Sequence, residues 1–255
     1  MLSVSGLTKA YGGVRVTQGV SIDFPAGSLT AIIGPNGAGK TTFFNLVSGQ
    51  VRPDAGRIVF DGQDITGLSS LQIVRRGMAR AFQVASLFPT LTVREALTAA
   101  VISHQRRSWQ VLSRFPLADA RARVEELLEL MGLGDSADTL SSILSHGDQK
   151  LLDIGLALAM NPKVLLLDEP TAGMGPDERW RMIEKVHSLW QRERLTVLFI
   201  EHDMDIVFKI AQRIYVLKYG AVLAQGTADE VRNNSEVIEA YLGTDHRVAA
   251  ALGEA

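Results

Sequence analysis

The chain has 255 residues, of which 46% are apolar and 21% charged, so it can bury a core for one large α/β domain or two small ones. Its 26 basic and 28 acidic residues give a formal net charge of −2, without the basic excess typical of nucleic-acid binders, so no nucleic-acid partner is expected. The absence of cysteine excludes disulfides, thiolate metal sites and thiol catalysis.

The apolar residues give no sign of a membrane span or a secretory signal. No apolar run approaches the roughly 18 residues that cross a bilayer. Residues 1–6 carry no basic region followed by an apolar block. We therefore expect a cytoplasmic chain, and work at a membrane would need another chain to cross it.

The opening third of the sequence alternates β-rich runs with turn residues, a pattern typical of strands. Residues 29–33 form a short run that is apolar apart from Thr30, as expected for a strand buried on both faces. In chain order, this third predicts strands over residues 2–7 and 16–24 around a turn at 11–13, a strand over 29–33, a helix over 42–48 and a strand over 57–60.

The middle of the chain changes to a helical pattern. Between Thr92 and Met160, apolar residues recur at helical spacing. The residues that carry this periodicity are Val93, Ala96, Leu97, Ala100 and Val101, and then Val124, Leu127, Leu128 and Met131. Residues 104–115 and 134–142 look like connectors. We interpret about 84–160 as a helical subdomain inserted into an α/β core.

Strands and helices then alternate again, which indicates the second half of an α/β sheet. The expected elements are buried strands over 164–167 and 196–200, helices over 176–194 and 203–211, a hairpin over 214–217 and 222–225, and a last helix over 234–242. We expect one domain over residues 1–243 and a weakly anchored tail over 244–255.

A glycine-rich loop follows the strand at 29–33 and precedes a helix. It matches G-x-x-x-x-G-K-[ST], which binds the phosphates of nucleoside triphosphates in this strand–loop–helix context. Glycines let backbone N–H groups face the phosphates, lysine adds positive charge, and a threonine hydroxyl can ligate Mg²⁺. The alternative, a chance glycine turn, is disfavoured by that context. The predicted ATP-binding residues are Gly34, Pro35, Asn36, Gly37, Ala38, Gly39, Lys40, Thr41 and Thr42, with Thr41 also a metal ligand.

Four apolar residues, 164–167, run directly into Asp168 and Glu169. Open α/β sheets bind ligands at the carboxyl ends of their strands, so Asp168 is a candidate Mg²⁺ ligand. Glu169 would point the other way in the strand alternation and could polarise an attacking water. The alternative is an exposed acidic pair at the start of a loop. His202 follows another buried strand and Gln83 a short β-like run, but neither is a functional signal alone.

The order of these motifs resembles the nucleotide-binding subunits of ABC transporters over nearly the full chain. The matching positions are Tyr11 at the aromatic that stacks on adenine, the phosphate-binding loop, Gln83 at the Q-loop, Leu144 to Gln149 (LSHGDQ) at the signature motif, Asp168 to Thr171 at the Walker B end and His202 at the switch histidine. The resemblance implies an α/β P-loop NTPase core with a mostly parallel sheet, an N-terminal antiparallel β-subdomain and the inserted helical subdomain.

The resemblance also implies activity, partners and residue roles. It implies an ATP hydrolase that uses Mg²⁺ and pairs head to tail with a second copy or a paralogue. The pair would lie on the inner face of the cell membrane against permease subunits. A periplasmic or extracellular solute-binding protein would deliver the solute to these permeases. The implied site residues are Glu169, His202 and Gln83 as catalytic groups, Thr41, Gln83 and Asp168 as metal ligands, and Tyr11, Ser145 and Gly147 as further nucleotide contacts, the last two toward the second chain's ATP.

A finer resemblance is to importers of branched-chain amino acids. The stretches that carry it are residues 41–46, residues 77–83 with 87–88 and 91–93, and residues 237–243. The Ser145-His146-Gly147 form resembles urea-type subunits, and subunits for lipopolysaccharide export are similar as well. Import of branched-chain amino acids or of a related small polar solute such as urea is therefore expected. The alternatives are a lipid or lipopolysaccharide exporter and a soluble non-transport ABC ATPase.

Two positions depart from the family pattern. His146 stands where the signature usually has glycine, and Gly175 stands where the D-loop usually ends in Asp or Asn. Bulk at His146 could alter closure of the dimer, and the lost side chain at Gly175 could weaken communication between its two sites. Neither position touches the metal or the base, so hydrolysis is still expected. An apolar groove around residues Phe82, Leu87, Phe88 and Leu91 is the candidate docking site for permeases, unless these are ordinary core residues.

Three rival classes use a similar loop. A small-molecule kinase is disfavoured by the signature at 144–149 and by His202. A soluble ABC protein of translation or DNA repair usually carries two such domains or a long coiled-coil insertion, and 255 residues hold neither. A non-catalytic nucleotide sensor is disfavoured by the intact Lys40, Asp168 and Glu169.

Overall fold

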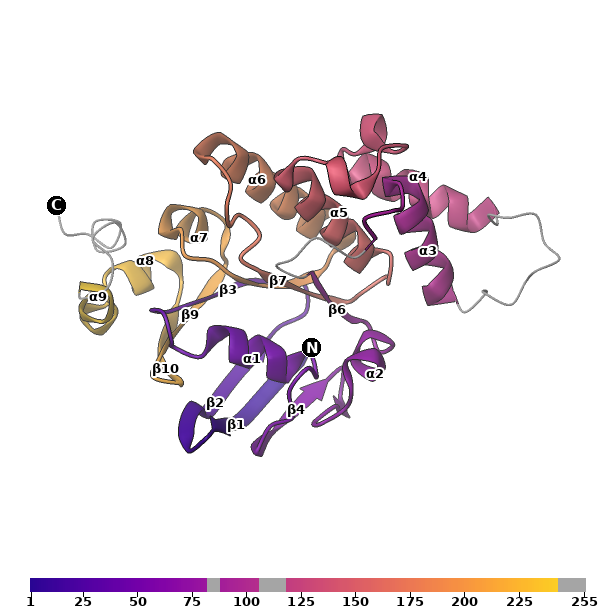
Figure 1. Ribbon diagram of the computed structural model, residues 1–255. Helices are drawn as coiled ribbons and strands as arrows, with labels where there is room; N and C mark the ends of the chain where they lie inside the picture. The colour runs from indigo at the N-terminus through magenta and orange to yellow at the C-terminus, as the bar shows by residue number, and fades with distance from the viewer. Residues whose placement is uncertain (82–87, 106–117, 243–255) are drawn as a thin grey trace.

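Among the residues that the structure describes, six strands form the central sheet, in the order β10-β9-β3-β8-β7-β6. The computed structural model describes residues 1–81, 88–105 and 118–242, and Figure 1 shows this sheet crossing the middle of the molecule. Its strands are β3 (Leu29–Ile33), β6 (Met78–Ala81), β7 (Val164–Asp168), β8 (Thr196–Ile200), β9 (Arg213–Lys218) and β10 (Ala221–Gly226). Neighbouring strands run parallel except β9 and β10, which form the predicted hairpin at one edge.

The strands β3, β7 and β8 are buried at every residue, as their apolar runs predicted. Successive side chains point to opposite faces of the sheet. In β3, Leu29, Ala31 and Ile33 belong to one core cluster and Ile32 belongs to the other. A sheet with apolar side chains on both faces must be covered on both.

Helices cover one face of the central sheet, and a second sheet covers the other, with helix α1 (Lys40–Val47) between the two sheets (Figure 1). The covering helices are α5 (His146–Leu158), α6 (Pro176–Glu193) and α7 (Met204–Ile210). The second sheet, with order β2-β1-β4-β5, contains β1 (Leu2–Tyr11), β2 (Val14–Phe24), β4 (Ala55–Phe60) and β5 (Gln63–Asp64). Helix α1 (Lys40–Val47) buries Phe43 and Phe44 against it. The predicted N-terminal antiparallel unit is confirmed.

A helical block lies beyond the β6 edge of the central sheet (Figure 1). Its elements are α3 (Val93–Gln105), α4 (Ala118–Met131), short 3-10 turns at Gly134–Ser136 and Ser141–Ile143, and α5. The predicted apolar positions are buried apart from Ala100, which is half-buried, and Val93, Leu97 and Leu127 have 0% exposure. They share one core cluster with Leu165 and Leu167 of β7, so the block packs continuously onto the sheet. The subdomain boundaries at 84 and 160 stay a prediction.

Three short helices complete the described chain. They are α2 (Ser70–Val74), α8 (Ala228–Arg232) and α9 (Ser235–Leu242). The sequence patterns predicted α9 but not α2 or α8, which are too short to show an apolar repeat. Both begin with a capping box, Ser69 with Gln72 and Thr227 with Glu230, and that spacing is a signal that could have found them. No helix in the described ranges is both long and apolar enough to cross a membrane.

Candidate functional site

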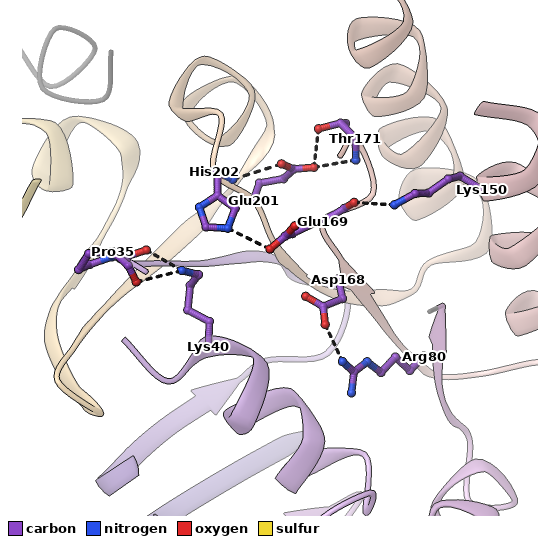
Figure 2. A network of polar contacts seen from close by, with 10 residues as sticks. Pro35, Lys40, Arg80, Lys150, Asp168, Glu169, Thr171, Glu201 and His202 are labelled. Carbon is purple, nitrogen blue, oxygen red and sulfur yellow. Dashed lines mark hydrogen bonds and ion pairs between the residues drawn. The ribbon is translucent and has the colours of Figure 1, made fainter. Parts of the chain in front are cut away.

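The carboxyl ends of four adjacent strands bring the main site residues together. Because β3, β8, β7 and β6 are neighbours in the sheet, the segments that follow or end them meet at one edge. Lys40 begins α1 directly after the loop that follows β3, His202 follows β8, and Asp168 and Glu169 lie at the end of β7. Figure 2 shows these four side chains converging, with Arg80 of β6 beside Asp168.

The loop between β3 and α1 needs glycine at particular positions. Gly34, Gly37 and Gly39 have φ values of 150°, 79° and 98°, which L side chains rarely adopt. A Cβ on Gly34 would lie 2.1 Å from the carbonyl oxygen of Leu217, and one on Gly39 would lie 2.5 Å from that of Val16. At Gly37 a Cβ would meet no atom within 4 Å, so this side of the loop is open.

Lys40 begins α1 and bonds the loop that precedes it. Its Nζ donates to the carbonyl oxygens of Gly34 at 2.6 Å and Pro35 at 3.2 Å (Figure 2), and the residue is only 6% exposed. Burial lowers the pKa of Lys40, against the opposing effect of the carboxylates of Glu169 and Asp168. The N-cap of α1 is Gly39, which has no side chain to bond the first N–H groups, so these groups remain suited to an anion.

Asp168 is half of a buried ion pair. Its Oδ2 accepts a hydrogen bond from Nη2 of Arg80 at 2.5 Å, and the two side chains are 2% and 8% exposed. Arg80 also donates to the side chain of Asn45 at 2.7 Å, which ties the pair to α1. The other oxygen of Asp168, Oδ1, is buried and has no hydrogen-bond partner among the described residues.

That unpartnered oxygen bears on the metal that this kind of loop implies. A buried carboxylate oxygen without a donor is costly unless a cation or water satisfies it, and Mg²⁺ prefers oxygen ligands. The site therefore fits Mg²⁺, with Asp168 Oδ1 as one ligand. Thr41, the second predicted ligand, is exposed at the start of α1. Gln83, the third, lies outside the described residues.

Glu169 and His202 contact one another directly. Nε2 of His202 lies 2.9 Å from Oε1 of Glu169 (Figure 2). The expectation that strand alternation directs Glu169 is wrong, because β7 ends at Asp168 and Glu169 has a φ of 50°. A left-handed turn therefore sets its direction. Few non-glycine residues adopt this conformation, and it tends to occur at functional positions.

Glu201 is a buried carboxylate next to His202 that the sequence reasoning missed. It is 4% exposed and accepts hydrogen bonds from Thr171 N at 2.9 Å, Thr171 Oγ1 at 2.7 Å and His202 N at 3.2 Å. Burial raises its pKa, although these hydrogen bonds oppose the shift. A carboxylate directly after four consecutive apolar residues, 197–200, was the available signal.

Two further buried cations were missed. Arg80 is a charged residue within the otherwise apolar strand β6. The contrast with its neighbours could have identified it as a candidate site residue. Lys150 lies on α5 on one helical face with buried Asp153, Ile154 and Ala157, a spacing that indicates an inward direction. Its Nζ donates to the carbonyl oxygen of Glu169 at 2.9 Å.

The remaining predicted nucleotide contacts lie on other elements. Tyr11, the last residue of β1, is 45% exposed, with Lys9 Nζ 5.7 Å from its ring centre. Ser145 caps α5, where its Oγ accepts from the N–H of Asp148 at 3.1 Å. A Cβ on Gly147 would lie 2.3 Å from Oε1 of Glu178, the far end of a flexible side chain that can move aside. Within the described residues, no hydrogen bond joins these three to the Lys40 loop.

The first departure from the family pattern makes a defined contact. Nε2 of His146 lies 3.1 Å from the carbonyl oxygen of Ala172, and since a carbonyl only accepts, the ring donates. This joins the signature motif to the segment that also contains Gly175. Of the proposed docking groove, Phe88 is 39% exposed and Leu91 half-buried, whereas Phe82 and Leu87 lie outside the described residues.

Comparison with known proteins gives the family. Residues 17–172 match the model of the ABC transporter, and residues 221–247 match that of the branched-chain amino acid ATP-binding cassette transporter. The chain is 39% identical over 251 residues to the high-affinity branched-chain amino acid transport ATP-binding protein LivG of Escherichia coli K12, covering 95% of this chain and 98% of that one. It is 34% identical to the lipopolysaccharide export system ATP-binding protein LptB of Haemophilus influenzae, covering 97% and 99%.

Solved structures agree with this result. The ADP conformation of an ATP-binding cassette of an ABC transporter has a TM-score of 0.82 and 32% identity to this chain, covering 95% of this chain and 98% of that one. The phosphate-binding loop, the acidic strand end and the helical block therefore occur in the fold and order that the motifs predicted. The chain belongs to the ABC transporter family, as an ATP-binding and ATP-hydrolysing subunit.

Proposed function

We propose that this subunit powers the import of branched-chain amino acids through separate permease subunits. The match of residues 221–247 carries this proposal, because that stretch lies outside the general ABC transporter match at 17–172. The relative at 39% identity, a branched-chain amino acid transport subunit, supports it over lipopolysaccharide export at 34%. A small polar solute such as urea is the second candidate, on the strength of the sequence at 145–147.

The phosphates of ATP would occupy the open side of the loop at Gly37. Backbone N–H groups of the loop and of the uncapped start of α1 would bind them. Lys40 would exchange the carbonyl oxygens of Gly34 and Pro35 for the β- and γ-phosphates, which favour its charged form. Tyr11 would stack on the adenine from its exposed position.

Thr41, Asp168 and Gln83 would hold Mg²⁺, directly or through water. When bound, the ion neutralises part of the charge on the phosphates. Arg80 keeps Asp168 fixed through Oδ2, which leaves Oδ1 for the ion.

Glu169 would act as the general base. A hollow of about 280 Å³ opens beside Glu169 and His202 and offers room for water. The Glu169 carboxylate would accept a proton from the water as the water oxygen attacks the γ-phosphorus. The bond from that phosphorus to the β–γ bridging oxygen would break, and ADP would leave with its electron pair. His202, donating through Nε2, would hold the carboxylate in place.

The loop would be only half of each site. We propose that a second copy or a paralogue pairs with this chain, and that Ser145 and Gly147 bind the ATP held by the partner's loop. The N-terminal end of α5 favours the negative phosphate there. The pair would sit on the cytoplasmic face of the membrane against permease subunits, and a solute-binding protein would deliver the solute on the other side.

Two measurements test this function. The first is ATP hydrolysis, in which Glu169→Gln should lower turnover by ~10²-fold or more while ATP binding and ATP-dependent dimers persist. The second is uptake into vesicles that hold the subunit with its permeases and binding protein. Labelled leucine should accumulate with ATP and not in the Glu169→Gln form. Uptake of urea without leucine would replace the solute assignment, and transport of neither would reject it.

A further inference from the structure

Helix α5 contacts the segment after β7 at two points. Lys150 Nζ donates to the carbonyl oxygen of Glu169 at 2.9 Å, and His146 Nε2 donates to that of Ala172 at 3.1 Å. The same carbonyl of Glu169 also accepts from the N–H of Ala172 at 3.1 Å. The turn from Glu169 to Ala172 is therefore bonded at both of its ends to the first turns of α5. Figure 2 shows Lys150 reaching the backbone of Glu169 from the side opposite His202.

The Lys150 contact is fixed by burial. Lys150 is 5% exposed, so its charge has little water to solvate it and depends on protein partners. Burial lowers its pKa, whereas the carboxylates of Glu201, Glu169, Asp153 and Asp168 oppose that shift and favour the ammonium. A buried ammonium that donates to a carbonyl makes a charge-assisted hydrogen bond, which is stronger than a neutral one.

The acceptor of this bond is the residue whose orientation matters most. Glu169 has a φ of 50°, a conformation that a non-glycine residue holds only when its surroundings impose it. Its N–H donates to the carbonyl oxygen of Ile200 at 3.0 Å, and its own carbonyl is held by Lys150 and Ala172. Loss of the Lys150 bond removes one of the constraints that keep the Glu169 side chain directed at His202.

The amino end of α5, the helix that carries Lys150, is exposed. Ser145, the N-cap of α5, lies on the surface, and a helix rise of about 1.5 Å per residue puts Lys150 only about 7 Å farther along the axis. A rigid turn and a half of helix therefore joins the exposed N-cap to the backbone of Glu169.

We propose that Lys150, assisted by His146, is a positioning residue that couples the two ATP sites of the dimer. The inference rests on the proposed function, in which Ser145 meets the partner's ATP while Glu169 serves this chain's own ATP. When the partner's nucleotide engages the amino end of α5, the helix shifts the turn at Glu169 to Ala172 through these two bonds. Occupation of one site then sets the geometry of the base in the other, which makes hydrolysis cooperative in ATP.

The test compares Lys150→Met with Lys150→Arg in the full-length dimer. The methionine keeps the length of the side chain and loses the donor, whereas arginine keeps a donor and a charge. Lys209→Met, at an exposed lysine on α7, is the matched control. The readouts are the maximal hydrolysis rate, the Hill coefficient for ATP, the Kd of a fluorescent ATP analogue and the unfolding temperature.

Lys150→Met should lose ~10- to 100-fold in maximal rate, as expected for a misdirected base, and its Hill coefficient should fall to about 1. Its Kd for the analogue should stay unchanged, because the Lys40 loop is untouched. Lys150→Arg should recover most of both properties, and Lys209→Met should match the parent chain. His146→Ala should lower the Hill coefficient with a smaller loss of rate.

Three outcomes overturn the coupling. One is a Lys150→Met protein with the parent's rate and Hill coefficient. Another is a loss of rate with an unchanged Hill coefficient, which would give Lys150 a merely structural role. The third is a parent chain that hydrolyses ATP without cooperativity, which would leave nothing to couple. If the parent chain neither hydrolyses ATP nor forms ATP-dependent dimers, the proposed function itself fails, and that result is seen before any variant is made.

Discussion

Glu169 and His202 face each other across the ends of two neighbouring strands, with 2.9 Å between Oε1 and Nε2. The pairing follows from topology, because β7 and β8 are adjacent and parallel, and Asp168 is in register with Ile200. Two residues that are 33 positions apart in the chain are thereby in hydrogen-bond contact. The carboxylate is 23% exposed and the imidazole 47%, so water can reach both.

Replacement of His202 by alanine should lower the maximal rate of ATP hydrolysis by ~10²-fold, the range for disabling acid–base chemistry, and leave ATP affinity unchanged. The reason is that His202 bonds Glu169 and, among the described residues, forms no hydrogen bond or ion pair with the Lys40 loop. The control is His104→Ala, at an exposed position on α3, which should hydrolyse ATP normally. A His202→Ala protein with full turnover would contradict the role given to the pair.

Removal of Arg80 should destabilise the fold. Arg80→Met leaves the Asp168 carboxylate buried at 2% exposure without its cation, and loss of one partner of such a pair typically costs ~3–5 kcal/mol. The free energy of unfolding in urea measures this. Arg57→Met is the matched control, because the Arg57–Asp64 pair is exposed and should contribute little. A second change, Asp168→Asn, should restore part of the stability lost in Arg80→Met, and failure to do so would contradict the ion-pair explanation.

The buried carboxyl of Glu201 should make stability depend on pH. Burial raises its pKa in the folded protein above the ordinary value of 4.5, so the folded chain holds this proton more strongly than the unfolded chain does. The stabilisation is complete below the ordinary pKa and is lost as pH rises through the raised pKa. The free energy of unfolding of the parent chain minus that of Glu201→Gln should therefore decrease as pH rises above about 4.5. A difference that increases with pH would reverse the assigned sign.

Alanine at either of two glycines of the phosphate-binding loop should weaken ATP binding, but only at Gly34 should a steric clash add to the loss of stability. Gly34→Ala puts a Cβ 2.1 Å from a backbone oxygen, so we expect a loss of roughly 1–3 kcal/mol or more as well as lost ATP binding. Gly37→Ala adds a methyl into open space, and only its left-handed φ costs about 1–2 kcal/mol. ATP affinity should nevertheless fall sharply if phosphate occupies that space. Normal ATP affinity in Gly37→Ala would place the phosphates elsewhere.

The sequence predicted the parts of the fold that depend on local pattern. The mostly apolar runs at 29–33, 164–167 and 196–200 predicted the three buried strands. A strand covered on both faces carries apolar side chains on both, so its sequence is a nearly continuous apolar run. The glycine pattern from Gly34 to Lys40 gave the loop, since few other arrangements use glycine at that spacing.

The site features that could not be predicted from the sequence depend on contacts between residues far apart in the chain. Arg80 and Asp168 are 88 residues apart, and only the order of the sheet brings β6 beside β7. Lys150 donates to a backbone oxygen, a partner that no residue type reveals. The conformation of Glu169 was also out of reach, because a glutamate gives no sign of a left-handed backbone. The role of Gln83, outside the described residues, stays a prediction.

Lys40 has a consequence for the rate of nucleotide exchange. Its ammonium bonds Gly34 and Pro35 of its own loop, so contacts within the chain already fold that segment around the position of the charge. Entry or departure of a nucleotide then requires one side chain to exchange hydrogen-bond partners, which takes far less time than refolding a loop. The slow steps of a transport cycle would therefore be opening and closing of the paired subunits, while each loop exchanges ADP for ATP quickly.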